Sequence, residues 1–289
     1  MWLPLIVFLA AASPSPSPSR PDQGRIEQLT GAKGAFDEKE GTFKVSVPRR
    51  DLSVSVAAAK LSPPMGLTSW ATFQRTADAT MVMGDMVLEE GQVSAVMSAA
   101  LDAGLEVTAL HNHFLWESPR ILFMHIGGHG PEETLATAVG KVFARIRETA
   151  GSAAPAFPAI DPARGTLDPA RIEAALGRKG QLADGVYKVA IGRTTQAHGA
   201  TVGNTMGVNT WAAFAGTDEA AVVDGDFAML EGELQDVLKA LRGAGIHVVA
   251  IHQHMTGENP RIVFLHYWGT GRAADLARGL KTALDRTAQ

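Results

Sequence analysis

Two short segments of the sequence carry the same set of three histidines and one glutamate. In each segment two histidines are separated by one residue, a glutamate follows, and a third histidine comes after a Pro-Arg pair. The sets are His111, His113, Glu117 and His125 in the first segment, and His252, His254, Glu258 and His266 in the second. The chain has only nine histidines, so most of them belong to this duplicated pattern.

Imidazole and carboxylate groups brought together in this way are typical ligands of a divalent transition metal. The residues around His111 and His113 predict a strand over 105–114, in which both side chains point to the same side. A returning strand over 120–126 would place His125 opposite one of them if the register is even. We therefore expect three imidazoles to converge in each segment, with zinc the first candidate and copper, manganese or iron the alternatives.

The glutamates add the possibility of hydrolytic chemistry. Glu117 and Glu258 are expected in the turn between the two strands, where each could act as an oxygen ligand or a general base. A metal with one open position can polarise a carbonyl or activate water. Two other interpretations stay open: the histidines could line a pocket for a different ligand, or be neutral residues of a buried face shared with Val107 and Ala109.

Two arginines and two tryptophans also recur, and are candidate ligand-binding residues: Trp70, Arg120, Trp211 and Arg261. Each arginine follows a proline and begins a returning strand. It could bind an anion through its guanidinium group or, as we prefer, pair with the aspartate of a repeated Gly-Asp motif, Asp85 or Asp226. The tryptophans are interpreted as core anchors or as platforms for a ligand.

These residues belong to a long internal repeat. "MGLTSWATF" from Met65 matches "MGVNTWAAF" from Met206, and the match continues without insertion to Gly130. A repeat of this length indicates a duplicated domain. We place the first unit at 22–150, a linker at 151–165 and the second unit at 166–289.

Each unit has the same predicted order of elements. A short helix leads to three strands, a helix with apolar residues at helical spacing follows, and two further strands precede a final helix. For the first unit we expect helices near 25–31, 93–104 and 131–147, and strands near 42–47, 70, 81–88, 105–114 and 120–126. This pattern predicts an α+β fold, in which a mainly antiparallel sheet has two main helices packed on one face.

Composition limits the class of protein. The chain has 289 residues, a net charge of −4 and no cysteine, which excludes disulfides, thiolate metal sites and thiol nucleophiles. No large basic cluster occurs, so nucleic acid is not an expected partner. The segment 1–21 resembles a signal peptide followed by a Ser/Pro linker, and no other segment is apolar for long enough to span a membrane.

The segments "PPMGLTSWATF", "HNHF" with "PRILFMH", "GDFAML" and "IHQHM" with "ENPRIVFLHYWG" together resemble the LppY/LpqO conserved-domain family. That resemblance covers nearly all of the chain after the linker. It implies a bacterial envelope protein with two units, but supplies no reaction. Members of that family that are lipoproteins have a cysteine to lipidate, which is absent here, so the resemblance implies a free periplasmic or secreted protein.

The function expected from the sequence is therefore binding of a divalent metal by an exported two-repeat protein, with metal-dependent hydrolysis as its enzymatic form. A non-catalytic protein that binds a small molecule or a cell-envelope polymer is the alternative. The duplication suggests a pseudo-symmetric monomer or a homodimer.

Overall fold

The computed structural model describes residues 20–152, 156–157 and 159–288. The predicted signal peptide lies outside this range, and so does the Ser/Pro linker apart from residues 20 and 21. Among the described residues, no helix is both long and apolar enough to cross a lipid bilayer.

The first repeat contains the elements α1 (Gln23–Thr30), β1 (Gly34–Asp37), β2 (Thr42–Pro48), β3 (Ser55–Val56), β4 (Ala59–Lys60), η1 (Pro63–Met65), β5 (Thr68–Arg75), β6 (Thr80–Glu89), η2 (Glu90–Gln92), α2 (Val93–Asp102), β7 (Glu106–His111), β8 (Glu117–Ser118), β9 (Ile121–Gly130) and α3 (Glu132–Glu148).

The second repeat contains η3 (Pro162–Arg164), α4 (Pro169–Leu176), β10 (Gln181–Ala183), β11 (Val186–Gly192), β12 (Thr195–Ala197), β13 (Ala200–Val202), η4 (Asn204–Met206), β14 (Asn209–Gly216), β15 (Ala221–Leu230), η5 (Glu231–Glu233), α5 (Leu234–Gly243), β16 (His247–His252), β17 (Ile262–Gly271) and α6 (Ala273–Leu284).

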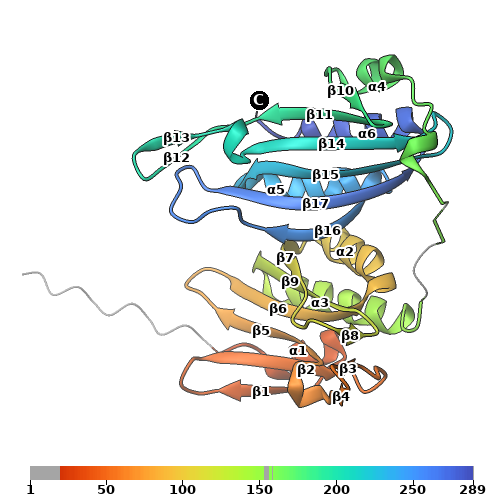
Figure 1. Cartoon of the computed structure of the whole chain (residues 1–289). Coiled ribbons are helices and arrows are strands. Elements are labelled where there is room, and N and C mark those ends of the chain that lie inside the picture. Colours follow the sequence, from red (N-terminus) through yellow and green to blue (C-terminus); the bar gives the residue numbers. More distant parts are fainter. Residues whose placement is uncertain (1–19, 153–155, 158, 289) are drawn as a thin grey trace, which may run out of the picture.

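The two repeats share one antiparallel sheet of 12 strands, in the order β1-β2-β5-β6-β9-β7-β16-β17-β15-β14-β11-β10. The order in the second repeat mirrors that in the first, with β7 and β16 adjacent at the centre (Figure 1). The predicted α+β duplication with helices on one face is confirmed. The joining of both sheets into one was not expected from the sequence.

The helices cover one face of this sheet and bury a continuous apolar core. The core includes Met97 of α2, Phe143 of α3, Leu238 of α5 and Leu280 of α6, so it extends through both repeats. Gly104, expected to end a helix, has a positive φ of 83° just after α2, which is a conformation that glycine adopts without strain. The helices lie behind the sheet in Figure 1.

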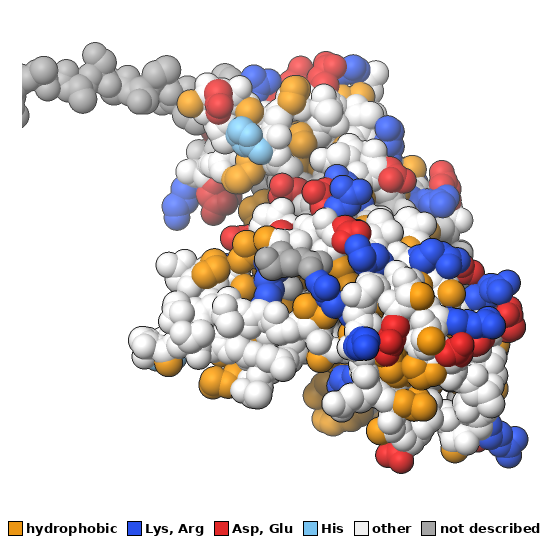
Figure 2. All heavy atoms as spheres, turned by 90° about the horizontal axis from the view of Figure 1, so that it is seen from above, with side chains coloured by type: hydrophobic (Ala, Val, Ile, Leu, Met, Phe, Trp, Pro, Cys, Tyr) orange, Lys and Arg blue, Asp and Glu red, His pale blue; other side chains and the backbone are white. Residues whose placement is uncertain are grey.

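The opposite face, here called the open face, is covered only at one end of each repeat. Two small sheets, β4-β3-β8 and β12-β13, lie there. Each accompanies a small apolar cluster, one around Phe123 and one around Phe264. The upper surface of the molecule carries basic and acidic side chains intermixed, without a large area of one sign (Figure 2).

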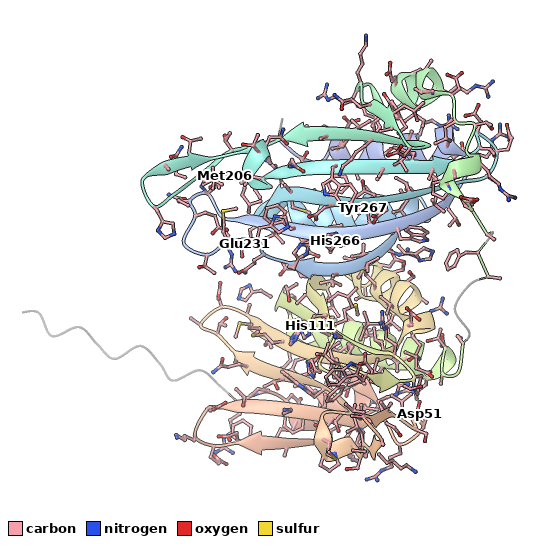
Figure 3. The ribbon with its side chains drawn as sticks, in the orientation of Figure 1. Asp51, His111, Met206, Glu231, His266 and Tyr267 are labelled. Atoms are coloured by element: carbon pink, nitrogen blue, oxygen red, sulfur yellow. The ribbon has the colours of Figure 1, made fainter. Side chains whose placement is uncertain are left out.

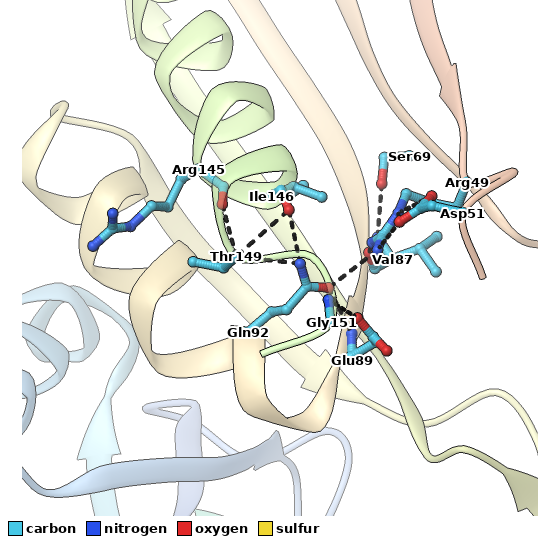
Figure 4. Close-up of polar contacts among 10 residues, drawn as sticks. All are labelled: Arg49, Asp51, Ser69, Val87, Glu89, Gln92, Arg145, Ile146, Thr149 and Gly151. Carbon is cyan, nitrogen blue, oxygen red and sulfur yellow. Dashed lines mark hydrogen bonds and ion pairs between the residues drawn. The ribbon is translucent and has the colours of Figure 1, made fainter. Parts of the chain in front are cut away.

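A buried arginine ties the strands of the first repeat to its helices (Figure 4). Arg49, which is 2% exposed, donates to Asp51 at 2.8 Å and to Gln92 Oε1 at 3.2 Å. Gln92 Nε2 donates in turn to the carbonyl of Ile146 at the end of α3. In the second repeat Arg193 donates to Glu233 at 2.6 Å, so both copies fix the sheet against the helices in a similar way.

Candidate metal centre

A bulge in each central strand places the histidines on the open face. In β7 the register shifts between Val107 and Ala109, and Ala109 pairs with His125. Val107 therefore faces the helices, whereas Ala109 and His111 face away from them. The alternative interpretation, in which Val107 shares one buried face with the histidines, is wrong for this reason. His111 and His266 lie on the side of the sheet away from the helices in Figure 3.

The strands are also shorter at their ends than expected. β7 ends at His111 and β16 ends at His252, so His113 and His254 lie in the loops that follow. Each of these loop histidines stacks on a phenylalanine of the returning strand, with ring centroids 3.3 Å apart for His113–Phe123. Stacking, and not strand alternation, holds the second histidine near the first.

In the second repeat three side chains meet closely. Asp226, His252 and His254 each offer a ligand atom, and these atoms lie within 4.8 Å of one another. The Nε2 atoms of the two histidines are 3.1 Å apart, and His254 Nε2 lies 3.2 Å from Asp226 Oδ2. His252 Nε2 lies 3.9 Å from the same oxygen.

These separations fit the ligand shell of a tetrahedral zinc ion. Zinc–ligand distances of about 2.0–2.1 Å place neighbouring ligand atoms about 3.3 Å apart. Two of the three separations are close to this value. The third, between His252 Nε2 and Asp226 Oδ2, reaches it after a small movement of one side chain. The residues present can therefore hold a divalent transition metal through one carboxylate and two imidazoles.

Asp226 reaches the site because of the strand order. It lies on β15, where it pairs with Trp211 on one side and with His266 on the other. Residues paired across an antiparallel sheet point to the same side, so this row crosses the open face. His266 then stacks on His252, with ring centroids 4.5 Å apart.

Backbone carbonyls fix the orientation of two histidines. His254 Nδ1 donates to the carbonyl of Gly207 at 3.1 Å, and His266 Nδ1 donates to the carbonyl of Gly225 at 3.3 Å. A carbonyl only accepts, so each Nδ1 donates to it, and Nε2 is the ring nitrogen left to face another partner. Metal-binding histidines commonly have this second hydrogen bond.

Burial shifts the pKa values of Asp226 and His252 in opposite directions. Desolvation raises the pKa of Asp226 to about 6, partly offset by His266 and His254. Desolvation also lowers the pKa of His252 to about 4, with His266 and His254 adding to this effect. Both groups thus favour the neutral form in the absence of a cation.

Buried polar atoms without a partner gather at the two histidine clusters. In the part of the chain that the structure describes, the side-chain atoms of this kind are Asp85 Oδ1, Asp226 Oδ1 and His252 Nδ1. An unpaired buried oxygen is unfavourable and is commonly satisfied by a water or an ion. The orphaned oxygens therefore indicate a missing partner at the same position in both repeats.

The first repeat has the same residues in a looser arrangement. His125 Nε2 lies 4.0 Å from Asp85 Oδ1, and His111 lies with its ring centroid 5.1 Å from those of both His113 and His125. Burial raises the pKa of Asp85 and lowers that of His113. The three predicted histidines are near one another here, but their ligand atoms are not as close as in the second repeat.

The two glutamates do not join these groups. Glu258 is 9% exposed, and its Oε1 accepts a hydrogen bond from the backbone N–H of Ile262 at 3.2 Å. Glu117 lies on β8 and pairs with Val56 of β3. In each repeat a longer loop replaces the expected tight turn. The glutamate takes part in the structure of that loop and does not lie among the histidines.

The arginines lie apart from the aspartates. Within the described residues neither Arg120 nor Arg261 forms an ion pair with Asp85 or Asp226, so the preferred salt-bridge interpretation is wrong. The aspartates face histidines instead. Both arginines are exposed, and Arg261 lines a groove that also includes His252.

The tryptophans are half-buried and each lies under a lysine. The ammonium of Lys44 is 4.2 Å from the Trp70 ring centroid, and that of Lys188 is 4.2 Å from Trp211. Because Trp211 pairs with Asp226, a row of cation, aromatic ring, carboxylate and imidazole crosses the open face.

The aspartates are the site residues that sequence reasoning missed. Their Gly-Asp motif was visible in both repeats, but nothing in the sequence places β6 next to β9 or β15 next to β17. The motif has glycine for a steric reason, because a Cβ on Gly225 would lie 2.1 Å from the hydroxyl of Tyr267.

Fold and site together define a duplicated α+β protein with one carboxylate–histidine cluster per repeat. The chain belongs to the family described as a Domain of Unknown Function (DUF1259), whose model matches residues 24–145 and 170–286. The exact unit limits of 22–150 and 166–289 stay a prediction. No curated protein matches the chain.

Two solved structures show weak similarity. One is a trimeric bacterial microcompartment shell protein, PduB, with 12% identity, a TM-score of 0.21, and coverage of 88% of this chain and 89% of that chain. The other is EtuB from Clostridium kluyveri, with 11% identity, a TM-score of 0.23 and the same coverage. These TM-scores are too low to support an argument about fold or function.

Proposed function

We propose that this chain binds a divalent transition metal, with zinc the first candidate, through Asp226, His252 and His254. The observation that carries the proposal is the closeness of the three ligand atoms, because the imidazole Nε2 atoms of His252 and His254 lie 3.9 and 3.2 Å from Asp226 Oδ2. The backbone carbonyl that accepts from His254 Nδ1 supports it, because it leaves Nε2 free for a metal.

His266 is the fourth residue of the proposed site. It would serve either as a further metal ligand or as a general base toward water. Its Nδ1 is bonded to the Gly225 carbonyl and its ring stacks on His252. In this form the protein is a metal-dependent hydrolase, because an open metal position activates water. His111, His113 and His125, with Asp85, form a second and weaker site of the same kind.

Metal content of protein purified without a histidine tag tests the proposal. After dialysis against zinc, wild-type protein should retain at least one zinc per chain. The double variant His252→Ala/His254→Ala should lose the tightly bound ion, whereas the matched variant His111→Ala/His113→Ala should keep it. Folded wild-type protein without bound metal would contradict the proposal.

We also propose that the protein acts in the periplasm or outside the cell, as a member of the LppY/LpqO group. The signal-like segment 1–21 and the resemblance described above support this location. N-terminal sequencing of protein recovered from the native host's envelope fraction tests it, with cleavage near Ala12 expected and a retained Met1 the contrary result.

A further inference from the structure

A groove lies at the junction of the two repeats. It has a volume of about 800 Å³ and is lined from both sides, by β7 of the first repeat and by the end of β16 and the start of α5 in the second. This volume is within the range of small-molecule sites. His252 belongs both to this lining and to the proposed metal cluster, so the groove and the cluster share one residue.

The groove forms because the two central strands separate. β7 and β16 pair at a single position, Leu110 with Ile251. Beyond it, the side-chain amide of Gln235 takes the place of a neighbouring strand: its Oε1 accepts from Val107 N–H at 2.9 Å and its Nε2 donates to Val107 C=O at 2.9 Å. An amide thus already occupies the strand edge as a peptide group would.

The groove carries charges of both signs. Arg261 provides a guanidinium, while Glu106 and Glu231 provide carboxylates, and all three side chains are exposed. A ligand complementary to this lining carries both a carboxylate and an ammonium group, as a short peptide does.

We propose that the groove binds a short peptide in an extended conformation, with its C-terminal carboxylate paired to Arg261 and its ammonium group near Glu106 and Glu231. One amide group of the peptide takes the position that the Gln235 side-chain amide occupies at Val107, which is the mode of β-strand addition. The inference rests on the proposed function where it places the peptide beside the metal.

Calorimetric titration with tri-alanine tests this inference, using zinc-loaded and chelated protein. C-terminal amidation of the peptide removes its carboxylate, and Arg261→Gln removes the partner. Each change should weaken binding about tenfold, as expected for one charge-assisted pair, and the two changes together should weaken it no further. Arg120→Gln, the equivalent position in the first repeat, should leave binding unchanged.

The ammonium end of the peptide is tested in the same way. N-terminal acetylation of tri-alanine removes the ammonium charge, and the double variant Glu106→Gln/Glu231→Gln removes its partners. Absence of tri-alanine binding to either form of the protein would overturn the inference, and so would equal loss in Arg120→Gln and Arg261→Gln. Arg261-dependent binding by protein that holds no zinc would leave this inference standing while the metal proposal fails.

Discussion

At the scale of single residues, the second site depends on the opposite effects of burial on Asp226 and His252. The carboxyl group binds its proton more tightly in the folded chain than in the unfolded chain, because its pKa is raised from 3.8 to about 6. The imidazole binds its proton more weakly in the folded chain, because its pKa is lowered from 6.5 to about 4. Both groups lose this preference when a cation binds between them.

These shifts predict opposite pH dependences for two variants of the chelated protein. Asp226 contributes stability that decreases as pH rises from about 4 to about 6, whereas the contribution of His252 increases from about 4 to about 6.5. Relative to wild type, Asp226→Asn should therefore gain stability as pH rises through this window, and His252→Gln should lose it.

Urea unfolding at a series of pH values between 4 and 6.5 measures both slopes, with metal removed by chelation. If the difference in unfolding free energy from wild type changes with pH in the same direction in both variants, the assignment of the pKa shifts to these residues is contradicted.

The spacing in the sequence predicted that the histidines lie near one another, but it did not predict the aspartate beside them. His252, His254 and His266 could be grouped from spacing alone, because they lie on two strands that are consecutive in the chain. Asp226 could not, because it lies on a strand that precedes an intervening helix, and only the strand order brings it near. Glu258 was chosen instead because it is close to His254 in the sequence.

At the scale of elements, turns and bulges position the site. The bulges in β7 and β16 decide which face the histidines occupy, and periodicity in the sequence does not reveal an extra residue in a strand. The η4 turn ends at Gly207, which has a φ of +84° and whose carbonyl accepts from His254. Gly66 takes the same place after η1, with a φ of +102°.

This symmetry offers a matched pair of variants. Gly207→Ala and Gly66→Ala both place a side chain at positive φ, so each should lower the free energy of unfolding by about 1 kcal/mol. Only Gly207→Ala disturbs the carbonyl that orients His254, and it should weaken zinc binding by about tenfold or more.

Chemical denaturation and zinc titration of the two proteins separate these effects. Equal zinc affinity in the two variants would show that the Gly207 carbonyl does not orient the ligand.

At the scale of the whole molecule, the two repeats form one folding unit. Their strands join in one sheet, and their helices share one apolar core that includes Phe143 and Leu238. The duplication, the element order and the helix-covered face could all be predicted from the sequence. The junction between the repeats could not be predicted. β7 and β16 pair at one position, and this pairing gives no recognisable pattern in the sequence.

We accordingly expect a single cooperative thermal transition, shifted upward as a whole by zinc. Scanning calorimetry should give equal calorimetric and van't Hoff enthalpies, and zinc should move the whole peak. Two separate transitions, of which zinc moves only one, would show that the repeats unfold independently.

The position of a bound ion tests the central claim most directly. Crystals soaked in zinc should give an anomalous difference peak, measured on both sides of the zinc absorption edge, about 2.0–2.2 Å from Asp226, His252 Nε2 and His254 Nε2. No peak between these three groups in fully soaked crystals, with the buried Asp226 oxygen bonded to water instead, would contradict the metal centre.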